Sequence, residues 1–204
     1  MGDRRMTRSA FITGSGGGLG VAVVERFLTA GWNVTAPRRA EVDLNDPEAV
    51  RRALEPAAPL HAVVNLAGGF AAGEPVAETP VETFEASLRL NLRTTYNVCH
   101  AAIPLLADDG AIVCTSSATA HAPFAGSAGY AASKAGVIAL AKAIAKEGVR
   151  CNVLLPSQID TPANRESMPE SAWVRLVPPE RIAAVVLWLC GPESAAINGA
   201  EVPV

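Results

Sequence analysis

The segment TGSGGGLG at residues 13–20 joins a short apolar run, Ala10–Thr13, to a stretch with helical periodicity that extends to Ala30. Glycines allow a tight turn and a close backbone approach to a pyrophosphate, while the helix that follows offers unpaired N–H groups and the positive end of its dipole. A flexible turn is the alternative interpretation, but the strand–loop–helix context favours nucleotide binding. A Walker A loop is excluded because no Lys-Ser or Lys-Thr follows.

Further apolar runs alternate with helical patterns along the chain. Continuous Val, Ile and Leu runs are typical of strands buried on both faces of a parallel sheet, and strand–helix alternation predicts a three-layer α/β fold with a doubly wound sheet. No repeat, low-complexity stretch or linker divides the sequence, so we expect one Rossmann-type domain over residues 1–204. The predicted strands are Ala10–Thr13, Trp32–Ala36, His61–Leu66, Ala111–Thr115 and Val149–Leu155.

Several helix boundaries are readable in the sequence. The segment TPVE at residues 79–82 matches a capping box with proline at the first helical position. Asp46 precedes a proline and Glu48, which predicts an N-cap with a favourable acidic first turn. Gly31 and Gly148 follow predicted helices, as C′ glycines do.

The connection after the second predicted strand is short. Asp43 and Leu44 follow Trp32–Ala36 after about six residues, whereas a full βαβ crossover needs a dozen or more. We therefore expect the helix after strand two to be missing or reduced to a loop.

Composition narrows the functional classes. The 204 residues are 50% hydrophobic and 18% charged, which excludes a disordered polymer. A net charge of −3 argues against nucleic acid as a partner, and the longest apolar stretch, Ile182–Cys190, is too short to span a membrane. No signal peptide is evident in the sequence. The four cysteines are far apart and form no C-x-x-C pair, and the three histidines lack the spacing of metal ligands. We expect a reduced cytoplasmic protein without a metal site.

Tyr130 and Lys134 are four residues apart and therefore lie on one face of a predicted helix. A nearby cation lowers the pKa of a phenol, which suits it to general acid/base work. Ser117 follows the Ala111–Thr115 strand, where open α/β sheets place site residues, so its hydroxyl could hold a substrate oxygen beside Tyr130. Without the other two residues, Ser117 would be interpreted as part of a plain strand-end turn.

These motifs together resemble a short-chain dehydrogenase/reductase of the ordinary single-domain kind, over nearly the whole chain. The resemblance implies that Tyr130 donates or accepts the proton, and that Ser117 orients and polarises the carbonyl. Lys134 would bind the nicotinamide ribose and depress the pKa of Tyr130, and Asn91 would hold a water in a proton relay through Lys134. The matching segments are residues 13–20, 65–68, 90–92, 117, 130–134, 152–157 and 159–162.

The resemblance also implies a set of cofactor contacts. Asp43 and Leu44 would contact adenine, and the Asn65–Gly68 segment would lie beside the adenine ribose. The segment from Pro156 to Thr161 would line the nicotinamide and set the face that transfers hydride. The implied cofactor-binding residues are Gly14, Ser15, Gly18, Leu19, Arg38, Asp43, Leu44, Asn65, Ala67, Gly68, Tyr130, Lys134, Pro156, Ile159 and Thr161.

The chain departs from the family pattern in three places. Ser157 replaces the usual glycine after Pro156, which predicts a looser backbone approach to the cofactor. The missing second helix resembles shortened members such as dihydropteridine reductase, but that enzyme lacks the serine that Ser117 provides here. The usual Asp-Gly-Gly tail is absent, which favours a dimer over a tetramer.

The sequence therefore predicts an NAD(P)-dependent oxidoreductase acting on a small-molecule carbonyl or secondary alcohol. A catalytically idle dinucleotide sensor, a dihydropteridine reductase-like enzyme, and an isomerase or dehydratase with a recycled cofactor are the alternatives. Arg38 stands where an NAD-specific sheet carries an acid, so NADP(H) is favoured and NAD(H) remains possible. Alanines spaced by four in the Gly129–Lys146 helix predict a homodimer or homotetramer. Candidate substrate walls, each equally consistent with packing, are Phe70, His121, Phe124, Met168 and Trp173.

Overall fold

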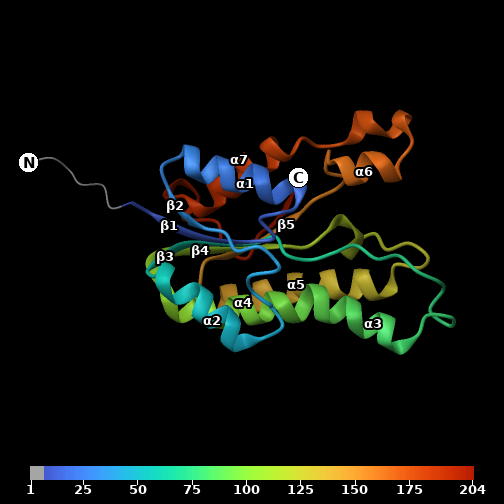
Figure 1. The fold of residues 1–204 in the computed structure, drawn as a ribbon, viewed down its shortest axis with the longest axis horizontal. Coiled ribbons are helices and arrows are strands. Elements are labelled where there is room, and N and C mark those ends of the chain that lie inside the picture. The colour runs from blue at the N-terminus through green and yellow to red at the C-terminus, as the bar shows by residue number, and fades with distance from the viewer. Residues whose placement is uncertain (1–6) are drawn as a thin grey trace, which may run out of the picture.

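The computed structural model of the protein describes residues 7–204 and contains one sheet of six parallel strands (Figure 1). The strand order is β2-β1-β3-β4-β5-β6. The chain moves from one side of β1 to the other between β2 and β3, so the switch point, where open α/β sheets bind ligands, lies between β1 and β3. The strands are β1 Ser9–Thr13, β2 Asn33–Thr35, β3 Leu60–Asn65, β4 Leu106–Thr115, β5 Cys151–Leu155 and β6 Glu201–Pro203.

Helices cover both faces of the sheet, which confirms the predicted three layers (Figure 1). Strand side chains alternate between the two apolar clusters: Phe11 and Val63 face one, whereas Ile12 and Val64 face the other. Both faces are buried, and this explains the continuous apolar runs in the sequence. On the face of Ile12 and Val64 lie α1 (Gly18–Thr29) and α7 (Pro179–Cys190). On the face of Phe11 and Val63 lie α2 (Pro47–Leu54), α3 (Val81–Leu88), α4 (Thr94–Ala102) and α5 (Ala128–Lys146), while α6 (Pro162–Ser167) extends beyond the sheet.

The helical region before β4 contains an irregular turn that the sequence did not indicate. A π-helical segment, Arg89–Arg93, separates α3 from α4. α5 packs closely against this region at two glycines, since a β-carbon at Gly136 would lie 2.8 Å from the Leu92 side chain and one at Gly129 would lie 3.1 Å from the Ser87 hydroxyl oxygen. These close approaches fix α5 beside the π segment.

The capping box predicted at residues 79–82 is wrong. The Thr79 hydroxyl donates to the carbonyls of Glu74 and Pro75, at 2.8 and 3.1 Å, and therefore caps nothing. Pro80 is the N-cap residue of α3, without a side-chain cap bond. The Asp46 cap is confirmed, because its carboxylate accepts a 2.9 Å bond from the Glu48 amide.

The expected gap after β2 is confirmed: no helix lies between Thr35 and Pro47. The usual outer strand is absent as well, since β2 forms the edge of the sheet instead of pairing on both sides. The five predicted strands are confirmed, although β4 begins at Leu106 rather than Ala111. The short β6 was missed because three residues that include Pro203 form no apolar run.

Among residues 7–204, no helix combines the length and apolar character needed to cross a membrane. All four cysteines are buried and free. The sulfur atoms of Cys99 and Cys114 lie 3.7 Å apart, and this contact together with burial raises the pKa of the Cys99 thiol. For Cys114, contact with Cys151 and burial raise the pKa, whereas the contact with Cys99 opposes that rise.

Candidate active site

The glycine-rich loop follows β1 and meets the end of β3 in direct backbone contact. Gly14 has φ +71°, and a β-carbon there would lie 2.8 Å from the Ala67 amide nitrogen. A β-carbon at Gly20 would lie 2.1 Å from the Gly14 carbonyl oxygen. Only glycine fits at either position. The loop of residues 14–20, referred to below as the glycine cradle, is therefore held close to the end of β3 at the switch point.

A buried chain of hydrogen bonds holds β1, β3 and α4 together beneath this cradle. The Thr13 hydroxyl donates to the Asn65 side-chain oxygen and accepts a 3.2 Å bond from the Ala67 amide. The Asn65 side-chain nitrogen donates to the Thr95 hydroxyl at 2.8 Å. Asn65 is the last residue of β3, and its side-chain amide is bonded within the protein, which leaves only its backbone to face a ligand.

The N-terminal end of α1 forms the next part of the cradle. Its N-cap residue, Gly17, makes no side-chain cap bond, so the first-turn N–H groups keep their capacity to bind an anion. Leu19 is buried, and a β-carbon at Gly18 would lie 2.5 Å from the Thr161 methyl group. The loop after β5 thus closes against the glycine-rich loop.

The segment after β5 is anchored at both ends. Ile159 forms an isolated parallel bridge with Val177, and the Thr161 hydroxyl caps α6 by accepting a 3.2 Å bond from the Asn164 amide. Ser157 adopts no left-handed conformation, and its amide donates to the Val204 carbonyl at 2.9 Å. The backbone at Ser157 therefore has a conformation that serine adopts without strain, so the replacement of glycine does not by itself hold the chain away from the cofactor. Pro156, the residue before Ser157, is buried.

The end of β2 is tied to the same loop. The Ser15 hydroxyl lies 3.1 Å from the carbonyl oxygens of Ala36 and Pro37, the two residues before Arg38. Arg38 is exposed, and among the described residues its guanidinium has no hydrogen-bond or ion-pair partner. Asp43 is exposed too, whereas Leu44 packs against the core.

The predicted catalytic residues converge where β4 ends. The Lys134 ammonium donates a 3.0 Å bond to the Thr115 carbonyl, and the Ser116 hydroxyl donates a 2.8 Å bond to the Lys134 carbonyl. These bonds fix the first turns of α5 against the strand end. The ammonium nitrogen lies 5.8 Å from the centre of the Tyr130 ring.

Asn91 reaches the same point from the π segment. Its side-chain oxygen accepts a 3.0 Å bond from the Gly69 amide. A β-carbon at Gly68 would lie 2.7 Å from that oxygen and 3.2 Å from the Lys134 nitrogen. The missing side chain of Gly68 is thus what lets Asn91 and Lys134 approach the same strand end.

Burial controls both ionisable groups of the site. Desolvation lowers the pKa of the Lys134 ammonium to about 8. Burial raises the pKa of the Tyr130 phenol, and a hydrogen bond with the Ser117 hydroxyl opposes that rise. The predicted lowering of the Tyr130 pKa by Lys134 is wrong for this structure, because desolvation outweighs the ammonium, which is directed at the Thr115 carbonyl.

Thr115 was not predicted as a site residue. Its carbonyl holds Lys134, and its hydroxyl oxygen is buried without a hydrogen-bond partner. Thr115 pairs with Leu154, which belongs to the cluster on the α1 and α7 face of the sheet. The sequence feature that could have identified Thr115 is its position at the end of a predicted strand, directly before Ser116 and Ser117.

An aromatic group borders Tyr130 on its open side. The Phe70 ring meets the Tyr130 ring edge-on at 5.1 Å, and the Phe124 ring lies 6.3 Å from Phe70. Two other candidate wall residues have different contacts. His121 pairs with Glu201, and the Arg165 guanidinium stacks 4.7 Å above the Trp173 ring.

These features fit a dinucleotide cofactor. The glycine cradle and the first turn of α1 suit a pyrophosphate, and the unpartnered Thr115 hydroxyl is a polar atom that a ligand at this edge could satisfy. The Ser117 and Tyr130 hydroxyls lie near each other at the open end of the site, called the mouth below. The arrangement can therefore polarise an oxygen atom and exchange a proton with it.

The comparisons with known proteins agree with this geometry. The family model described as enoyl-(acyl carrier protein) reductase matches residues 33–204. The 3-oxoacyl-(acyl carrier protein) reductase MabA of Mycobacterium bovis is 30% identical, with 98% of this chain and 92% of that protein covered. The cyclic-di-GMP-binding biofilm dispersal mediator protein of Escherichia coli is 30% identical over 95% of this chain and 93% of its own.

One similar solved structure contains a bound nicotinamide cofactor. The blue fluorescent protein from a metagenomic library, crystallised in complex with NADPH, superposes with a TM-score of 0.85. It is 28% identical, with 97% of this chain and 96% of that chain covered. The glycine cradle and the strand-end cluster thus belong to a fold that holds NADPH in that protein.

Replacing Lys134 with methionine should stabilise the protein below pH 8. The folded-state pKa of about 8 lies below the unfolded value of 10.5, so the protonated form penalises folding. The penalty is full below pH 8 and disappears as the pH rises towards 10.5. Allowing for the lost bond to Thr115, we expect about 1–2 kcal/mol of added stability at pH 7.

Urea unfolding at pH 7 and pH 10 measures this effect. The advantage of Lys134→Met should shrink by more than half at the higher pH. Lys146→Met, at an exposed position of the same helix, serves as the control and should change the free energy of unfolding little at either pH. A destabilised Lys134→Met protein at pH 7 would contradict the predicted cost of the buried ammonium.

Proposed function

Because the chain belongs to the short-chain dehydrogenase/reductase family, we propose that this NAD(P)-dependent oxidoreductase uses Tyr130 as the acid/base in the reduction of a carbonyl or the oxidation of a secondary alcohol. The observation that carries the assignment is the placement of Tyr130 and Lys134 one helical turn apart on α5, with the Lys134 ammonium bonded to the Thr115 carbonyl at the strand end that leads into Ser117. When bound, the nicotinamide supplies or accepts the hydride.

The other groups of the site have distinct roles in this proposal. The Ser117 hydroxyl holds the substrate oxygen in line with the Tyr130 phenol. In the reductive direction, Tyr130 releases its proton to that oxygen, and Lys134, one helical turn further along α5, would hold the nicotinamide ribose beside it. Asn91 keeps the Gly68–Gly69 backbone beside Lys134 and positions a water that returns the proton.

We place the cofactor and catalytic sites in one domain, since both lie at the carboxyl edge of one sheet. Four free, buried cysteines support a reducing compartment, and we assign the protein to the cytoplasm.

A second candidate function is the binding of a dinucleotide without catalysis, because one relative is named for binding cyclic-di-GMP. A screen of aldehydes, ketones, quinones and 3-oxoacyl thioesters with NADPH and NADH separates the two. Steady loss of absorbance at 340 nm supports the enzyme, whereas binding of a dinucleotide without turnover of any carbonyl supports the sensor.

Tyr130→Phe should abolish turnover while cofactor binding survives. Phenylalanine keeps the ring contact with Phe70 but removes the proton, and general acid/base groups contribute about 10²–10⁴-fold. The measurements are kcat on a substrate from the screen and the NADPH Kd from fluorescence. Tyr96→Phe, at an exposed position on α4, is the matched control and should keep wild-type kcat. A Tyr130→Phe enzyme with more than a tenth of wild-type kcat would refute the role.

We further propose that NADP(H) is preferred and that Arg38 is the reason. Ser15 holds the two residues before Arg38 at the glycine-rich loop, which brings the guanidinium to the adenine side of the cradle. A guanidinium pairs with a 2′-phosphate through charge-assisted bonds but cannot accept a bond from a ribose 2′-hydroxyl.

Arg38→Asp should therefore reverse or erase the preference. Loss of one charge-assisted contact of about 1.5–3 kcal/mol corresponds to a change of roughly tenfold to a hundredfold in the ratio of kcat/KM for NADPH and NADH. Arg52→Asp, an exposed arginine on α2, is the control. A wild-type preference for NADH, or an unchanged ratio in Arg38→Asp, would overturn the assignment.

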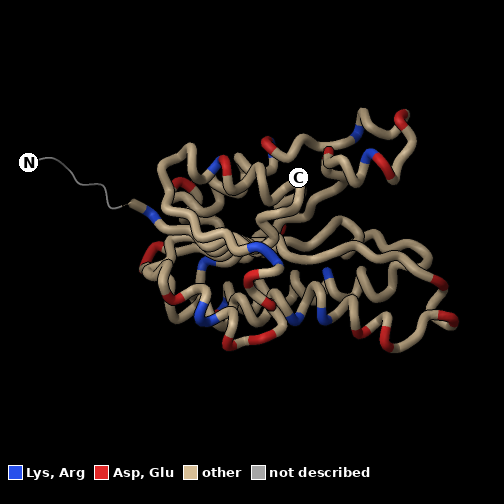
Figure 2. Tube along the Cα trace, in the orientation of Figure 1, with Lys and Arg blue, Asp and Glu red and all other residues tan. Residues whose placement is uncertain are grey.

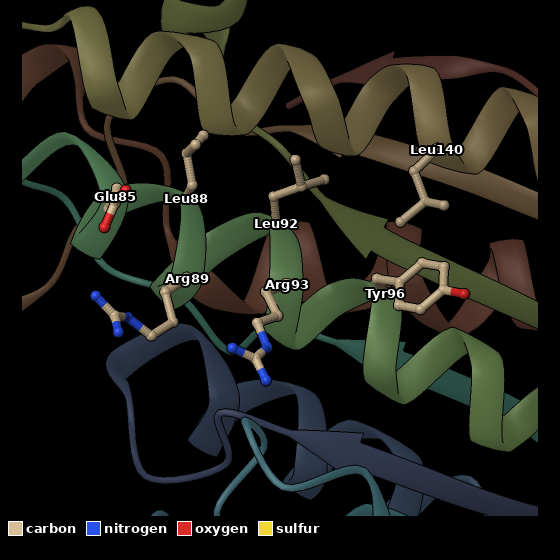
Figure 3. Close-up of a pocket in the computed structure, with 7 residues that line it drawn as sticks. All are labelled: Glu85, Leu88, Arg89, Leu92, Arg93, Tyr96 and Leu140. Carbon is tan, nitrogen blue, oxygen red and sulfur yellow. The ribbon is translucent and has the colours of Figure 1, made fainter. Parts of the chain in front are cut away.

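We propose that the protein forms homodimers or homotetramers through α4 and α5. The alanines of the predicted helix face do not face the sheet: Ala135, Ala139 and Ala143 are exposed. Beside them, a groove of about 530 Å³ lies between the π segment and α5 (Figure 3). Leucine side chains from both sides line it, a pattern that suits helix packing (Figure 3). The lining residues are Glu85, Leu88, Arg89, Leu92, Arg93, Tyr96 and Leu140.

Light scattering at micromolar concentration should give at least twice the 21.1 kDa of one chain. Ala139→Arg places a charged side chain on the exposed face of α5 and should reduce the mass to that of the monomer. Ala195→Arg, at an exposed position after the short turn Pro192–Ser194, should leave it unchanged. A monomeric wild-type protein would rule this interface out.

A further inference from the structure

Two aromatic side chains stand open beside the Tyr130 phenol. The Phe70 side chain is 64% exposed and that of Phe124 is 49% exposed, although both belong to loops that are held in place. The Gly73 amide donates a 2.9 Å bond to the Gly126 carbonyl and so joins the loop of Phe70 to the loop of Phe124. The site therefore presents fixed apolar ring faces next to the group that handles the proton.

The segment that carries Phe70 and leads into α3 is negatively charged. Residues 67–84 contain Glu74, Glu78 and Glu82 but no Lys or Arg, and all three glutamates are exposed. Figure 2 shows only acidic positions along the loop that leads into α3. The opposite segment, residues 116–134, contains one cation, Lys134, whose ammonium is buried and bonded to the Thr115 carbonyl, and its His121 is paired with Glu201.

The third side of the mouth, residues 157–178, adds no available cation that outweighs these acids. The Arg165 guanidinium is paired with Asp160, at 2.7 Å between Nη2 and Oδ2, and stacks on Trp173. Arg175 is the second arginine of this segment, which also contains Glu166 and Glu170. Arg89 and Arg93 line the groove beside α5.

We propose that the substrate of this site is an uncharged carbonyl compound, or the corresponding alcohol, with a flat aromatic or conjugated group next to the reacting carbon. This inference rests on the function proposed above. The flat group packs against the exposed sides of Phe70 and Phe124, and the carbonyl oxygen reaches Ser117 and Tyr130. The glutamates of the mouth repel substrates that carry a carboxylate, sulfonate or phosphate.

Two physical effects set the size of this selectivity. Paired aromatic rings gain stabilisation beyond their buried area, enough to favour an aryl over an alkyl group about fivefold. Three carboxylates at roughly 10 Å from an anion in water weaken its binding by a further factor of about five at low ionic strength. Salt screens the second effect and leaves the first one intact.

A matched pair of ketones tests the charge selectivity. Methyl 4-acetylbenzoate and 4-acetylbenzoate share one shape and differ by one charge, and kcat/KM is measured for both with saturating NADPH at 10 mM ionic strength. In the variant Glu74→Gln/Glu78→Gln/Glu82→Gln, the ester-to-carboxylate ratio should fall about fivefold relative to wild type. Comparison with the wild-type ratio cancels the intrinsic reactivity difference between the two ketones.

A second charge variant and a salt series complete this test. Glu25→Gln/Glu147→Gln/Glu193→Gln makes the same change of charge at exposed positions away from the mouth and should leave the ratio within twofold. At 0.5 M NaCl the effect of the mouth variant should also shrink to less than twofold. A ratio that the mouth variant leaves unchanged at low salt would overturn the charge selectivity.

Phe70→Leu tests the aromatic wall. It should lower kcat/KM for acetophenone about fivefold more than kcat/KM for cyclohexyl methyl ketone, a non-aromatic ketone of similar size. Trp188→Leu, which removes an exposed aromatic ring on α7, is the control and should affect both ketones equally. An equal loss for both ketones in Phe70→Leu would reject stacking as the basis of selectivity.

Failure of this inference can be separated from failure of the proposed function. If the enzyme reduces ketones but prefers the carboxylate, the oxidoreductase assignment stands and the substrate class is wrong. If it reduces no carbonyl, saturation-transfer NMR of the ester and the carboxylate with the wild-type protein still tests the mouth. Binding of the ester alone supports the inference, and equal or stronger binding of the carboxylate contradicts it.

Discussion

The Lys134 ammonium is buried at the carboxyl edge of the sheet, and the Thr115 carbonyl is the acceptor that it finds there. A buried cation is costly unless its surroundings are arranged for it. The surrounding features serve that arrangement: Gly68 leaves room for it, Asn91 fixes the neighbouring backbone, and Ser116 holds the helix that carries it. The site thus depends on a group that the fold accommodates at a cost, as is common where chemistry rather than stability determines a residue.

The cofactor side is organised by the opposite kind of constraint, the absence of side chains. Gly14 and Gly20 bring backbone segments into contact, and the buried chain through Thr13, Asn65 and Thr95 prevents those segments from separating. Polar groups that a strand end would otherwise expose are satisfied within the protein, which leaves the first turn of α1 to meet an anion. The network of Thr13, Asn65 and Thr95 therefore keeps the backbone below the glycine cradle rigid, while the N–H groups in the first turn of α1 stay free to bind an anion.

Much of this architecture could be predicted from local sequence, because apolar runs, glycine positions and the Tyr130–Lys134 spacing are local signals. The features that could not be predicted are set by tertiary contacts. The π segment at Arg89–Arg93 and the loss of the Thr79 cap follow from packing against α5 and from the loop before α3. The direction of the Tyr130 pKa shift depends on burial, which residue spacing does not reveal. β6 has too few residues to give a periodic pattern.

The missing outer strand also changes how the molecule can meet its neighbours. Within residues 7–204 the sheet ends on one side at β2 and on the other at β6, and each has only three residues. Open edges are the places where sheets of different molecules join and aggregate, and short edges or prolines prevent this. β2 offers too short a ladder to recruit a foreign strand, and β6 contains Pro203, which has no N–H to donate. The shortened fold thereby resists amyloid-like growth at both edges, even though it lacks the covering strand that larger sheets of this kind possess.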